Sequence, residues 1–329
     1  MSAQQESIKN SEEIYKKISK FVPEVEWKVH QPLIEKINKL KKEKNAIILA
    51  HNYQTPEIYH GVADIAADSL ALAVEASKTS ADKIIMCGVH FMAETAKLMS
   101  PNKKVFLPDM KAGCSLSTSI TGADVRMLKQ KYPGVPVVSY VNTSADVKAE
   151  TDVCCTSANA VKVVESLNVK KVIFLPDQYL ADYVSKNTKV KIISWKGTCI
   201  VHEQFSAKEI QDIKKQNPGI KVIAHPECPP DVIKASDFTG STSGMINYVK
   251  DNQPKKVMLV TECSMSDNVE ADNPNVSFIK PCNLCPYMKK IDLKKILDCL
   301  ENETNEIILD NKTIEAARKS VIRMTEIGR

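Results

Sequence analysis

The chain has no long hydrophobic run, few aromatic residues and no strong excess of charge. None of its apolar segments approaches the roughly 18 residues needed to span a bilayer, so we expect no membrane association. Aromatic residues make up 5% of the 329 residues, and no basic stripe carries interleaved aromatic side chains, so nucleic-acid binding is disfavoured. The net charge of +5 is spread among acidic residues, which is typical of a solvated surface with some attraction for small anions.

The first residues, MSAQQESIKNSEEIYKK, also lack the features of a secretory signal. They are polar and mixed in charge, with no apolar centre and no small-residue cleavage site. We therefore expect a cytoplasmic protein. The ten cysteines then need an explanation other than a disulfide framework, because the cytoplasm is reducing. We expect them to bind metal, to act in catalysis or simply to be buried.

Short apolar segments alternate with amphipathic ones through the middle of the chain. This alternation predicts βαβ units with parallel sheets, and a chain of this length predicts two or three domains. Nine segments are typical of fully buried strands: 46–50, 83–86, 105–107, 137–141, 172–175, 191–194, 222–224, 257–260 and 276–279. Helices are predicted between many of them, for example at 68–78, 159–167, 206–216 and 244–251.

The nine strands form three groups of three, and each group repeats the same polar positions. The first strand of each group ends in a triplet: His51-Asn52-Tyr53, Tyr140-Val141-Asn142 or His225-Pro226-Glu227. A hydroxyl residue follows each triplet 17 or 18 residues later: Ser69, Ser157 and Thr242. The third strand leads to a loop with a cysteine, and these cysteines are 85 and 86 residues apart: Cys114, Cys199 and Cys285. Such periodicity predicts three homologous α/β units.

Ligands bind beyond the carboxyl ends of strands in open parallel sheets, so we expect the three units to face one central site. The flanking segments do not repeat and are interpreted as helices that pack on the core. We predict N-terminal helices in 1–44, repeats at 45–130, 131–217 and 218–300, and a C-terminal helical segment at 301–329.

The repeat selects one cysteine per unit, which makes three candidate ligands rather than four. A closed structural zinc site normally has four ligands, whereas a cubane cluster held by three thiolates leaves one iron open to bind substrate oxygen. Glycine closely precedes Cys114 and Cys199 and lets the backbone turn around a bulky cofactor. Proline follows Cys285, as in several iron–sulfur motifs. We therefore predict a catalytic iron–sulfur cluster, with a non-enzymatic zinc or oxygen-sensing protein as the alternative.

The remaining cysteines fit simple burial better. Cys87 and Cys263 end buried strands, and Cys154, Cys155 and Cys299 are interpreted as packing residues. Cys228 follows the third triplet and is a candidate to line the cavity. Three roles stay open for Cys282: a fourth ligand, a redox partner of Cys285 or a bystander. The last two are favoured, because Cys282 has no counterpart in the other two units.

The triplets bring acids, bases and hydrogen-bond donors to the same strand ends, and histidine titrates near neutrality. The three hydroxyl residues lie near predicted helix starts, where they can cap the helix or help its N-terminus bind an anion. His90 and Glu94 are one helical turn apart and are interpreted as structural rather than as a metal pair. His202 and Glu203 follow Cys199 and are expected to orient its loop.

These residues resemble the quinolinate synthase (NadA) family from about residue 30 to the C-terminus. The motifs are HNYQ at 51–54, ADSL at 67–70, GVHFMAE at 88–94, PDMKAGCSL at 108–116, YVN at 140–142, CTSANA at 155–160, GTCIVHE at 197–203, HPEC at 225–228, GSTSGM at 240–245 and CPYM at 285–288. The resemblance implies an α/β fold of three homologous three-layer α/β/α domains, with parallel sheets in a pseudo-threefold arrangement around a central cluster site.

The resemblance also implies a reaction, a cofactor and partners. The enzyme would condense iminosuccinate (iminoaspartate) with dihydroxyacetone phosphate to quinolinate, with loss of phosphate and two waters, in de novo NAD biosynthesis. One [4Fe-4S] cluster per chain would be held by Cys114, Cys199 and Cys285, and its open iron would act as a Lewis acid for dehydration. An L-aspartate oxidase or dehydrogenase is the expected functional partner. The alternative is another iron–sulfur hydro-lyase acting on a small dicarboxylate.

Residue roles carry over position by position. The substrate-binding positions of the family map onto His51, Ser69, Tyr140, Val141, Asn142, Ser157, His225, Pro226, Glu227 and Thr242. Its catalytic positions map onto Tyr53, His51, His225 and Glu227. Some family members carry further cysteines before the last ligand. Of that pattern, this chain has only Cys282.

Overall fold

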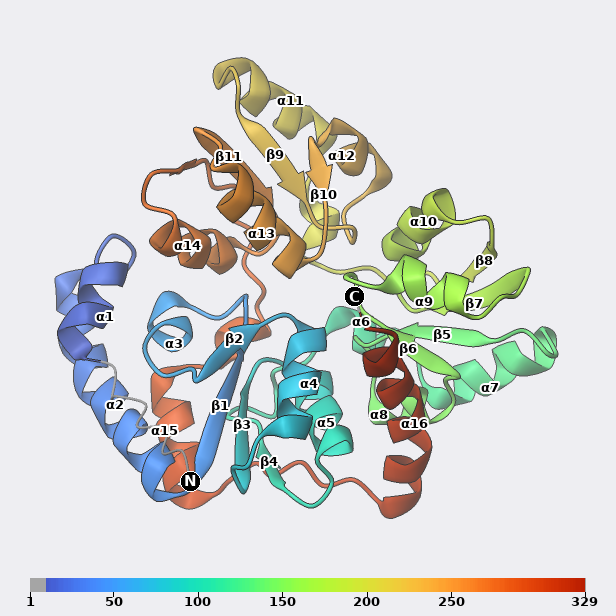
Figure 1. Cartoon of the computed structure of the whole chain (residues 1–329), viewed down its shortest axis with the longest axis horizontal. Helices are drawn as coiled ribbons and strands as arrows, with labels where there is room; N and C mark the ends of the chain where they lie inside the picture. Colours follow the sequence, from blue (N-terminus) through green and yellow to red (C-terminus); the bar gives the residue numbers. More distant parts are fainter. Residues whose placement is uncertain (1–9, 329) are drawn as a thin grey trace.

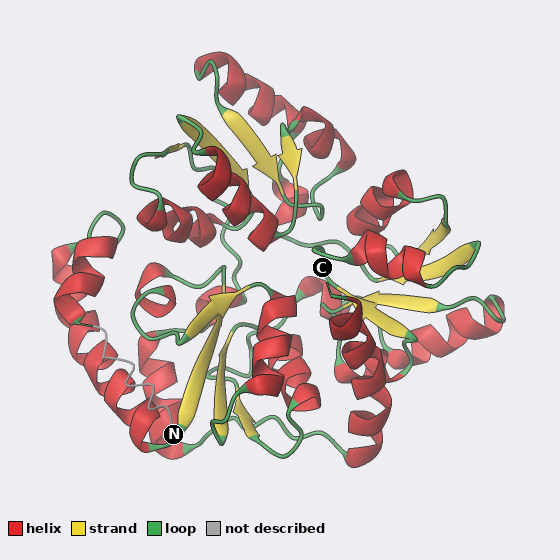
Figure 2. Cartoon of the chain, viewed as in Figure 1, coloured by secondary structure: helices red, strands yellow, loops and turns green. Residues whose placement is uncertain are grey.

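Three parallel sheets of four strands each form the centre of the molecule, in a computed structural model that describes residues 10–328 (Figure 1). The strand order is the same in each sheet: β2-β1-β3-β4, β6-β5-β7-β8 and β10-β9-β11-β12. Helices flank the sheets, and the strands of all three point toward the middle of the molecule (Figure 2). The predicted fold of three α/β/α units in a threefold arrangement is confirmed.

We refer to the sheets with their helices as the first, second and third repeat. The N-terminal helices are α1 (Ser11–Ile18) and α2 (Glu24–Glu43). The first repeat contains β1 (Ala46–His51), α3 (Pro56–Tyr59), β2 (Ile65–Ala67), α4 (Ser69–Lys78), β3 (Lys83–Cys87), α5 (His90–Met99), β4 (Lys104–Phe106), α6 (Ser115–Thr118) and α7 (Gly122–Lys131). The second contains β5 (Val137–Tyr140), α8 (Ala145–Ala149), β6 (Val153–Cys155), α9 (Ala160–Ser166), β7 (Lys171–Leu175), α10 (Gln178–Asn187), β8 (Lys191–Ser194), the 3-10 helix η1 (His202–Gln204) and α11 (Ala207–Gln216).

The third repeat contains β9 (Lys221–Ala224), α12 (Pro230–Ala235), β10 (Phe238–Thr239), α13 (Thr242–Asn252), β11 (Lys256–Val260), α14 (Cys263–Asp272), β12 (Ser277–Phe278) and the 3-10 helix η2 (Met288–Lys290). The C-terminal helices are α15 (Leu293–Asn302) and α16 (Asn311–Ile327). The exact domain boundaries stay a prediction.

The central strands form because each is a short apolar run that can be buried on both faces. In β7 and β11 a lysine is followed by four buried residues, the pattern of a strand covered by helices on both sides. In the third sheet, Val222 and Met258 face one hydrophobic cluster, while Ile223 and Leu259 face another. Nothing along these strands alternates between polar and apolar, because neither face meets water.

Three strands were predicted in each repeat, but each sheet has four, so one strand per repeat was missed. The missing strands are β2, β6 and β10, which are two or three residues long and lie at the same edge of each sheet. Runs this short carry too little apolar signal to be recognised. They matter because each ends two or three residues before a predicted hydroxyl residue, and so brings it to the carboxyl edge of the sheet.

The predicted helices form where expected, but the hydroxyl residues do not cap them. Asp68 and Ser241 cap α4 and α13 by accepting hydrogen bonds from backbone amides, as N-cap side chains do. Ser69 and Thr242 are therefore the first helical residues. Ser157 lies three residues before α9 begins. Their hydroxyl groups are not used as N-caps.

The packing of the repeats is unequal. One hydrophobic cluster runs through the first and second repeats and a smaller one covers the other face of the second sheet, whereas two clusters separate from these cover the two faces of the third sheet. The C-terminal helix α16 buries Ala317, Val321 and Met324 against α5, α8 and β6, so it joins the first two repeats. Helix α15 packs against α2 and β3. In the described part of the chain, no helix is both long and apolar enough to cross a membrane.

Candidate active site

A cavity lies where the carboxyl ends of the three sheets meet, and residues of all three repeats line it. The predicted site residues among its lining are His51, Tyr53, Ser69, Cys114, Tyr140, Asn142, Ser157, Cys199, His225, Glu227, Thr242 and Cys285. Two predicted substrate positions, Val141 and Pro226, are not part of the lining. The repeat thus brings together side chains that are up to 234 positions apart in the sequence.

All three cysteines of the repeat reach this cavity as free thiols, and each one directly precedes or nearly precedes a helical turn. In every case the sulfur accepts hydrogen bonds from the backbone amides two and three residues further on. The donors are Leu116 and Ser117 for Cys114, Val201 and His202 for Cys199, and Tyr287 and Met288 for Cys285. Amides at the start of a helical turn stabilise a thiolate, which is the form that binds metal.

A second threefold feature holds the cysteine loops in place. In each repeat a helix follows the third strand along the chain: α5 after β3, α10 after β7 and α14 after β11. The first backbone amide of this helix donates a hydrogen bond to the backbone carbonyl two residues before the cysteine. The three bonds are His90 N to Ala112 O (2.7 Å), Gln178 N to Gly197 O (2.9 Å) and Cys263 N to Asn283 O (3.1 Å). The same backbone bond therefore anchors all three cysteine loops.

The three thiols fit a group that supplies positive charge. Burial raises the pKa of Cys114 to about 12, that of Cys199 well above its usual range, and also that of Cys285. A neutral thiol is favoured in such a cavity until a metal group replaces the proton. Cys228, expected as a lining residue, is buried outside the lining and contacts Val260 O. The repeat thus brings one thiol to the cavity from each unit, beside the imidazole and carboxylate groups of the lining.

Glu227 is the buried carboxylate of the cavity. Tyr140 Oη donates to its Oε1 at 2.5 Å, and His202 Nδ1 lies 2.8 Å from its Oε2. Burial alone would favour the neutral acid, but the neighbouring imidazoles and the Tyr140 hydroxyl hold the pKa of Glu227 well below its usual range. Together with Cys199 Sγ, the His202 and Glu227 ligand atoms lie within 4.8 Å of one another. Glu227 is therefore ionised beside a thiol.

The two predicted catalytic histidines are neutral at physiological pH. Burial lowers the pKa of His51 to about 4 and that of His225 to about 3, although Glu227 opposes both shifts. His225 Nε2 lies 3.2 Å from Ser157 Oγ, which links the third repeat to the second. Asn142 Oδ1 is buried and has no hydrogen-bond partner among the described residues. A neutral imidazole can accept a proton, and a free amide oxygen can accept a hydrogen bond from a ligand.

The family model of quinolinate synthetase A protein (NadA) matches residues 35–326. The chain belongs to this family. Quinolinate synthase of Sinorhizobium fredii (strain NBRC 101917 / NGR234) is 60% identical over 314 residues, which cover 95% of this chain and 88% of that protein. The quinolinate synthase of Xylella fastidiosa (strain 9a5c) is 59% identical over 294 residues, 89% of this chain and 87% of that protein. The quinolinate synthase of Caulobacter vibrioides (strain NA1000 / CB15N) is 55% identical over 318 residues, which cover 95% of this chain and 87% of that protein. The chain is an enzyme of the NadA family, and the non-enzymatic alternative is wrong.

Sequence reasoning missed Thr261 in this NadA site. Its hydroxyl lies 2.6 Å from Tyr53 Oη and 2.9 Å from His202 Nε2, and it is fully buried. Hydrogen bonds therefore run from Tyr53 through Thr261 and His202 to Glu227. Thr261 directly follows β11, so its place at a strand end was the available signal. Burial raises the pKa of Tyr53 well above its usual range, which keeps its hydroxyl protonated.

Two weaker predictions have clear outcomes. His202 contacts Cys199 Sγ at 3.1 Å and so holds the Cys199 loop, whereas Glu203 is exposed. Glu94 accepts a hydrogen bond from Ala145 N at 3.0 Å and lies 3.7 Å from His90. The hydrogen bond from Ala145 N joins α5 to the start of α8 and gives Glu94 the structural role that was expected, whereas the role of the His90 side chain stays a prediction.

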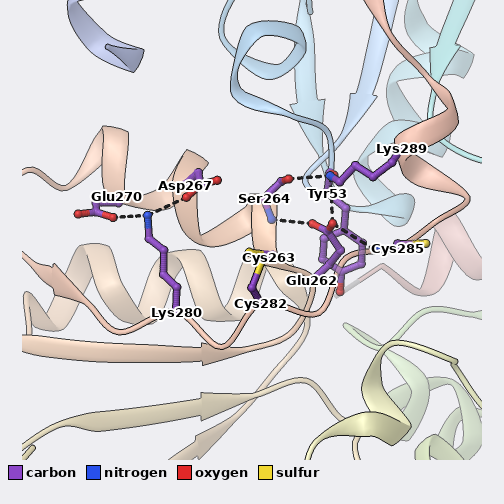
Figure 3. Close-up of a disulfide and its surroundings, with 10 residues drawn as sticks. All are labelled: Tyr53, Glu262, Cys263, Ser264, Asp267, Glu270, Lys280, Cys282, Cys285 and Lys289. Atoms are coloured by element: carbon purple, nitrogen blue, oxygen red, sulfur yellow. Dashed lines mark hydrogen bonds and ion pairs between the residues drawn. A yellow bond between two sulfur atoms is a disulfide. The ribbon is translucent and has the colours of Figure 1, made fainter. Parts of the chain in front are cut away.

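A disulfide joins Cys263 to Cys282 (Figure 3). It corrects three expectations: that the chain has no disulfide, that Cys263 is simply a buried residue at the end of a strand, and that a redox partner of Cys282 would be Cys285. Cys285 instead remains a free thiol at the cavity. The distance in sequence, 19 residues, and the absence of a counterpart in the other repeats hid this pair. The disulfide ties the loop before Cys285 to the start of α14.

Proposed function

We propose that this chain is a quinolinate synthase that condenses iminosuccinate with dihydroxyacetone phosphate and releases phosphate and two waters in de novo NAD biosynthesis. The observation that carries the proposal is the central cavity, which collects one free thiol from each repeat beside buried proton donors and acceptors. The relationship to proteins named quinolinate synthase supports it.

Cys114, Cys199 and Cys285 would hold one [4Fe-4S] cluster per chain. The two backbone amides aimed at each sulfur support this assignment, because they stabilise thiolates without adding charge. When bound, such a cluster supplies an iron that no cysteine occupies and that acts as a Lewis acid for dehydration.

Both substrates are anions, and two helices begin at the cavity. Ser69 and Thr242, the first residues of α4 and α13, line it. Helix N-termini favour carboxylate and phosphate groups, and the two hydroxyls add hydrogen bonds. Ser157 and Asn142 approach from the second repeat. The unpartnered Asn142 Oδ1 suits an N–H or O–H group of the substrate.

Proton transfers would be shared among four side chains. Forming the ring requires protons to leave carbon and nitrogen, and each departing hydroxyl requires a proton. The neutral imidazoles of His51 and His225 and the ionised Glu227 can accept protons. Tyr53, protonated and bonded to Thr261, can donate one. Tyr140 holds the Glu227 carboxylate through Oε1.

Iminosuccinate is the two-electron oxidation product of the amine of aspartate. An L-aspartate oxidase or dehydrogenase would therefore supply it. We further propose a cytoplasmic location, with repeats at 45–130, 131–217 and 218–300 between the flanking helical segments.

The test is an assay of the purified chain, reconstituted with iron and sulfide under anaerobic conditions and supplied with both substrates. Quinolinate measured by chromatography and mass spectrometry is the expected product. Glu227→Gln should lower kcat by about 10²–10⁴, the usual contribution of an acid–base group, while Glu165→Gln on the exposed face of α9 should not. Failure to form quinolinate with full iron and sulfide content would overturn the proposal. Dehydration of a hydroxy-dicarboxylate instead would favour another hydro-lyase.

A further inference from the structure

Glu262 occupies an unusual place behind the cavity. It is fully buried and directly precedes α14, where its Oε2 accepts a hydrogen bond from Ser264 N at 2.8 Å and caps the helix. Its other oxygen, Oε1, faces away from this cap. Oε1 accepts a hydrogen bond from the Cys285 amide at 3.3 Å and lies 3.0 Å from Lys289 Nζ. One carboxylate thus holds both a helix start and a cysteine loop.

Lys289 extends this contact into the first repeat. Its Nζ donates to the backbone oxygen of Tyr53 at 2.9 Å and to Ser264 Oγ at 2.6 Å. The side chain of Lys289 is only 22% exposed. Figure 3 shows Glu262 and Lys289 close to Tyr53, with Cys285 nearby. The chain of contacts runs from the Cys285 backbone through one ion pair to the Tyr53 backbone.

Comparison with the other repeats shows that helix capping does not explain Glu262. Asp177 is the corresponding residue before α10 and accepts two amide hydrogen bonds through Oδ1. Its Oδ2 has no hydrogen-bond partner among the described residues. Val89 precedes α5 and has no polar side chain. Only the third repeat uses the second carboxylate oxygen, and uses it on the loop that carries Cys285.

We infer that Glu262 and Lys289 are positioning residues that fix Cys285, in the third repeat, relative to Tyr53, in the first. The inference rests on the proposed function for the roles of Cys285 and Tyr53. An ion pair with a fully buried carboxylate and four further hydrogen bonds is stiff, because losing Lys289 leaves the charge of Glu262 without a partner in a dry environment. Loss of either member should therefore free the Cys285 loop locally, while the backbone anchors of Cys114 and Cys199 stay in place.

The experiment measures the alkylation rate of each cavity cysteine in the cluster-free full-length chain. Iodoacetamide is the probe, and peptide mass spectrometry separates Cys285 from Cys114 and Cys199. Glu262→Gln and Lys289→Met should each raise the rate at Cys285 roughly tenfold, the loss expected for a hydrogen bond to a charged group. The rates at Cys114 and Cys199 should stay unchanged. Lys289→Arg, which keeps the charge, should preserve the slow rate at Cys285.

Lys41→Met is the matched control. Lys41 is a buried lysine of α2 that pairs with Asp64 of the first repeat at 2.7 Å, so its loss is a comparable general perturbation. It should leave the Cys285 rate unchanged. In the cluster-loaded chain, Lys289→Met should lower kcat about tenfold with little change in KM, since Tyr53 acts on bound substrate.

Equal acceleration at all three cysteines, or none at Cys285, would overturn the positioning role. These alkylation rates need no substrate. A wild-type chain that forms no quinolinate would defeat the proposed function, whereas an unchanged Cys285 rate in an active chain defeats only the positioning role.

Discussion

The cysteine loop of the third repeat is held differently from those of the first and second. The first two loops bind each other through Ser115, whose hydroxyl donates to Thr198 O at 3.0 Å and accepts from Ile200 N at 3.2 Å. The third loop reaches the Cys199 loop only through a long hydrogen bond, from Asn283 Nδ2 to Val201 O at 3.5 Å, and is otherwise tied to its own helix α14. Besides the Glu262 contact with Cys285, the Cys263–Cys282 disulfide and the ion pair of Lys280 with Asp267 hold it (Figure 3).

The difference follows from how the repeats pack. The first and second repeats share one hydrophobic cluster and α16, and all three cavity cysteines pack against that cluster. The third repeat has its own clusters, and the residues around Cys285, such as Leu284 at 52% exposure, are open to solvent. Few buried contacts make a loop easy to open. The three cysteines are equivalent in the repeat, but different contacts hold each of their loops in place.

The largest effect should come from the cysteines themselves, where the repeats are equivalent. Serine at Cys114, Cys199 or Cys285 should lower quinolinate formation by more than about a hundredfold, since even residues that only orient metal ligands cost 10–100-fold. Iron content and visible absorbance should fall alike in all three variants. Cys228→Ala, outside the cavity lining, is the control. A variant that keeps its iron would remove that cysteine from the ligand set.

The disulfide should matter next, and only in the third repeat. Cys282→Ser should lower the free energy of unfolding by about 3 kcal/mol, because a bond closing a loop of this length restricts the unfolded chain. Cys282 is exposed, so the substitution creates no cavity. Urea unfolding followed by circular dichroism measures the change. Wild type reduced with dithiothreitol should unfold at the same urea concentration as the variant; a separate, higher midpoint would contradict the assignment.

A smaller effect is expected from Ser115, which serves only the first two loops. Ser115→Ala should raise the iodoacetamide rates of Cys114 and Cys199 about threefold in the cluster-free chain, in line with the net value of a neutral hydrogen bond. Cys285 should not respond, the reverse of the Glu262→Gln pattern. Ser117→Ala keeps the amide that Cys114 uses and is the control. Acceleration at Cys285 would show that the three loops are not supported separately.

The smallest effect should come from a change at the amino ends of the strands of the first sheet, which lie opposite the carboxyl ends and the cysteine loops. Hydrogen bonds from Lys104 and Lys83 lower the pKa of Glu303 to about 2. A lowered carboxyl pKa stabilises the fold fully above the ordinary value of 4.5 and loses this effect as the pH falls toward the folded value. Glu303→Gln should therefore lower Tm at pH 7, with a difference that shrinks between pH 4.5 and 2.

Differential scanning fluorimetry at several pH values measures this difference, with the exposed Glu315→Gln as control. A difference in Tm that does not depend on pH would mean that Glu303 acts through packing rather than charge. Quinolinate formation should be the same in both variants and wild type.

Most of the site could be predicted because its residues obey the repeat. Cys114, Cys199 and Cys285, like the three triplets, follow apolar strands at a nearly constant spacing, and strand ends of parallel sheets converge. The edge strands could not be predicted, since two or three residues are too few for a recognisable pattern. Thr261 was missed because nothing in the sequence indicates that its hydroxyl lies between Tyr53 and His202.

The sequence by itself determined the three-unit α/β fold, the three thiols and the polar strand ends, because each is set by local pattern repeated along the chain. Only the tertiary structure decided how each thiol is supported. The pairing of Cys263 with Cys282, the Ser115 bridge and the contact of Lys289 with Tyr53, 236 residues away, depend on distances between surfaces that no local pattern encodes. The repeat makes the cysteines equivalent, and the packing of each repeat against its neighbours makes their surroundings differ.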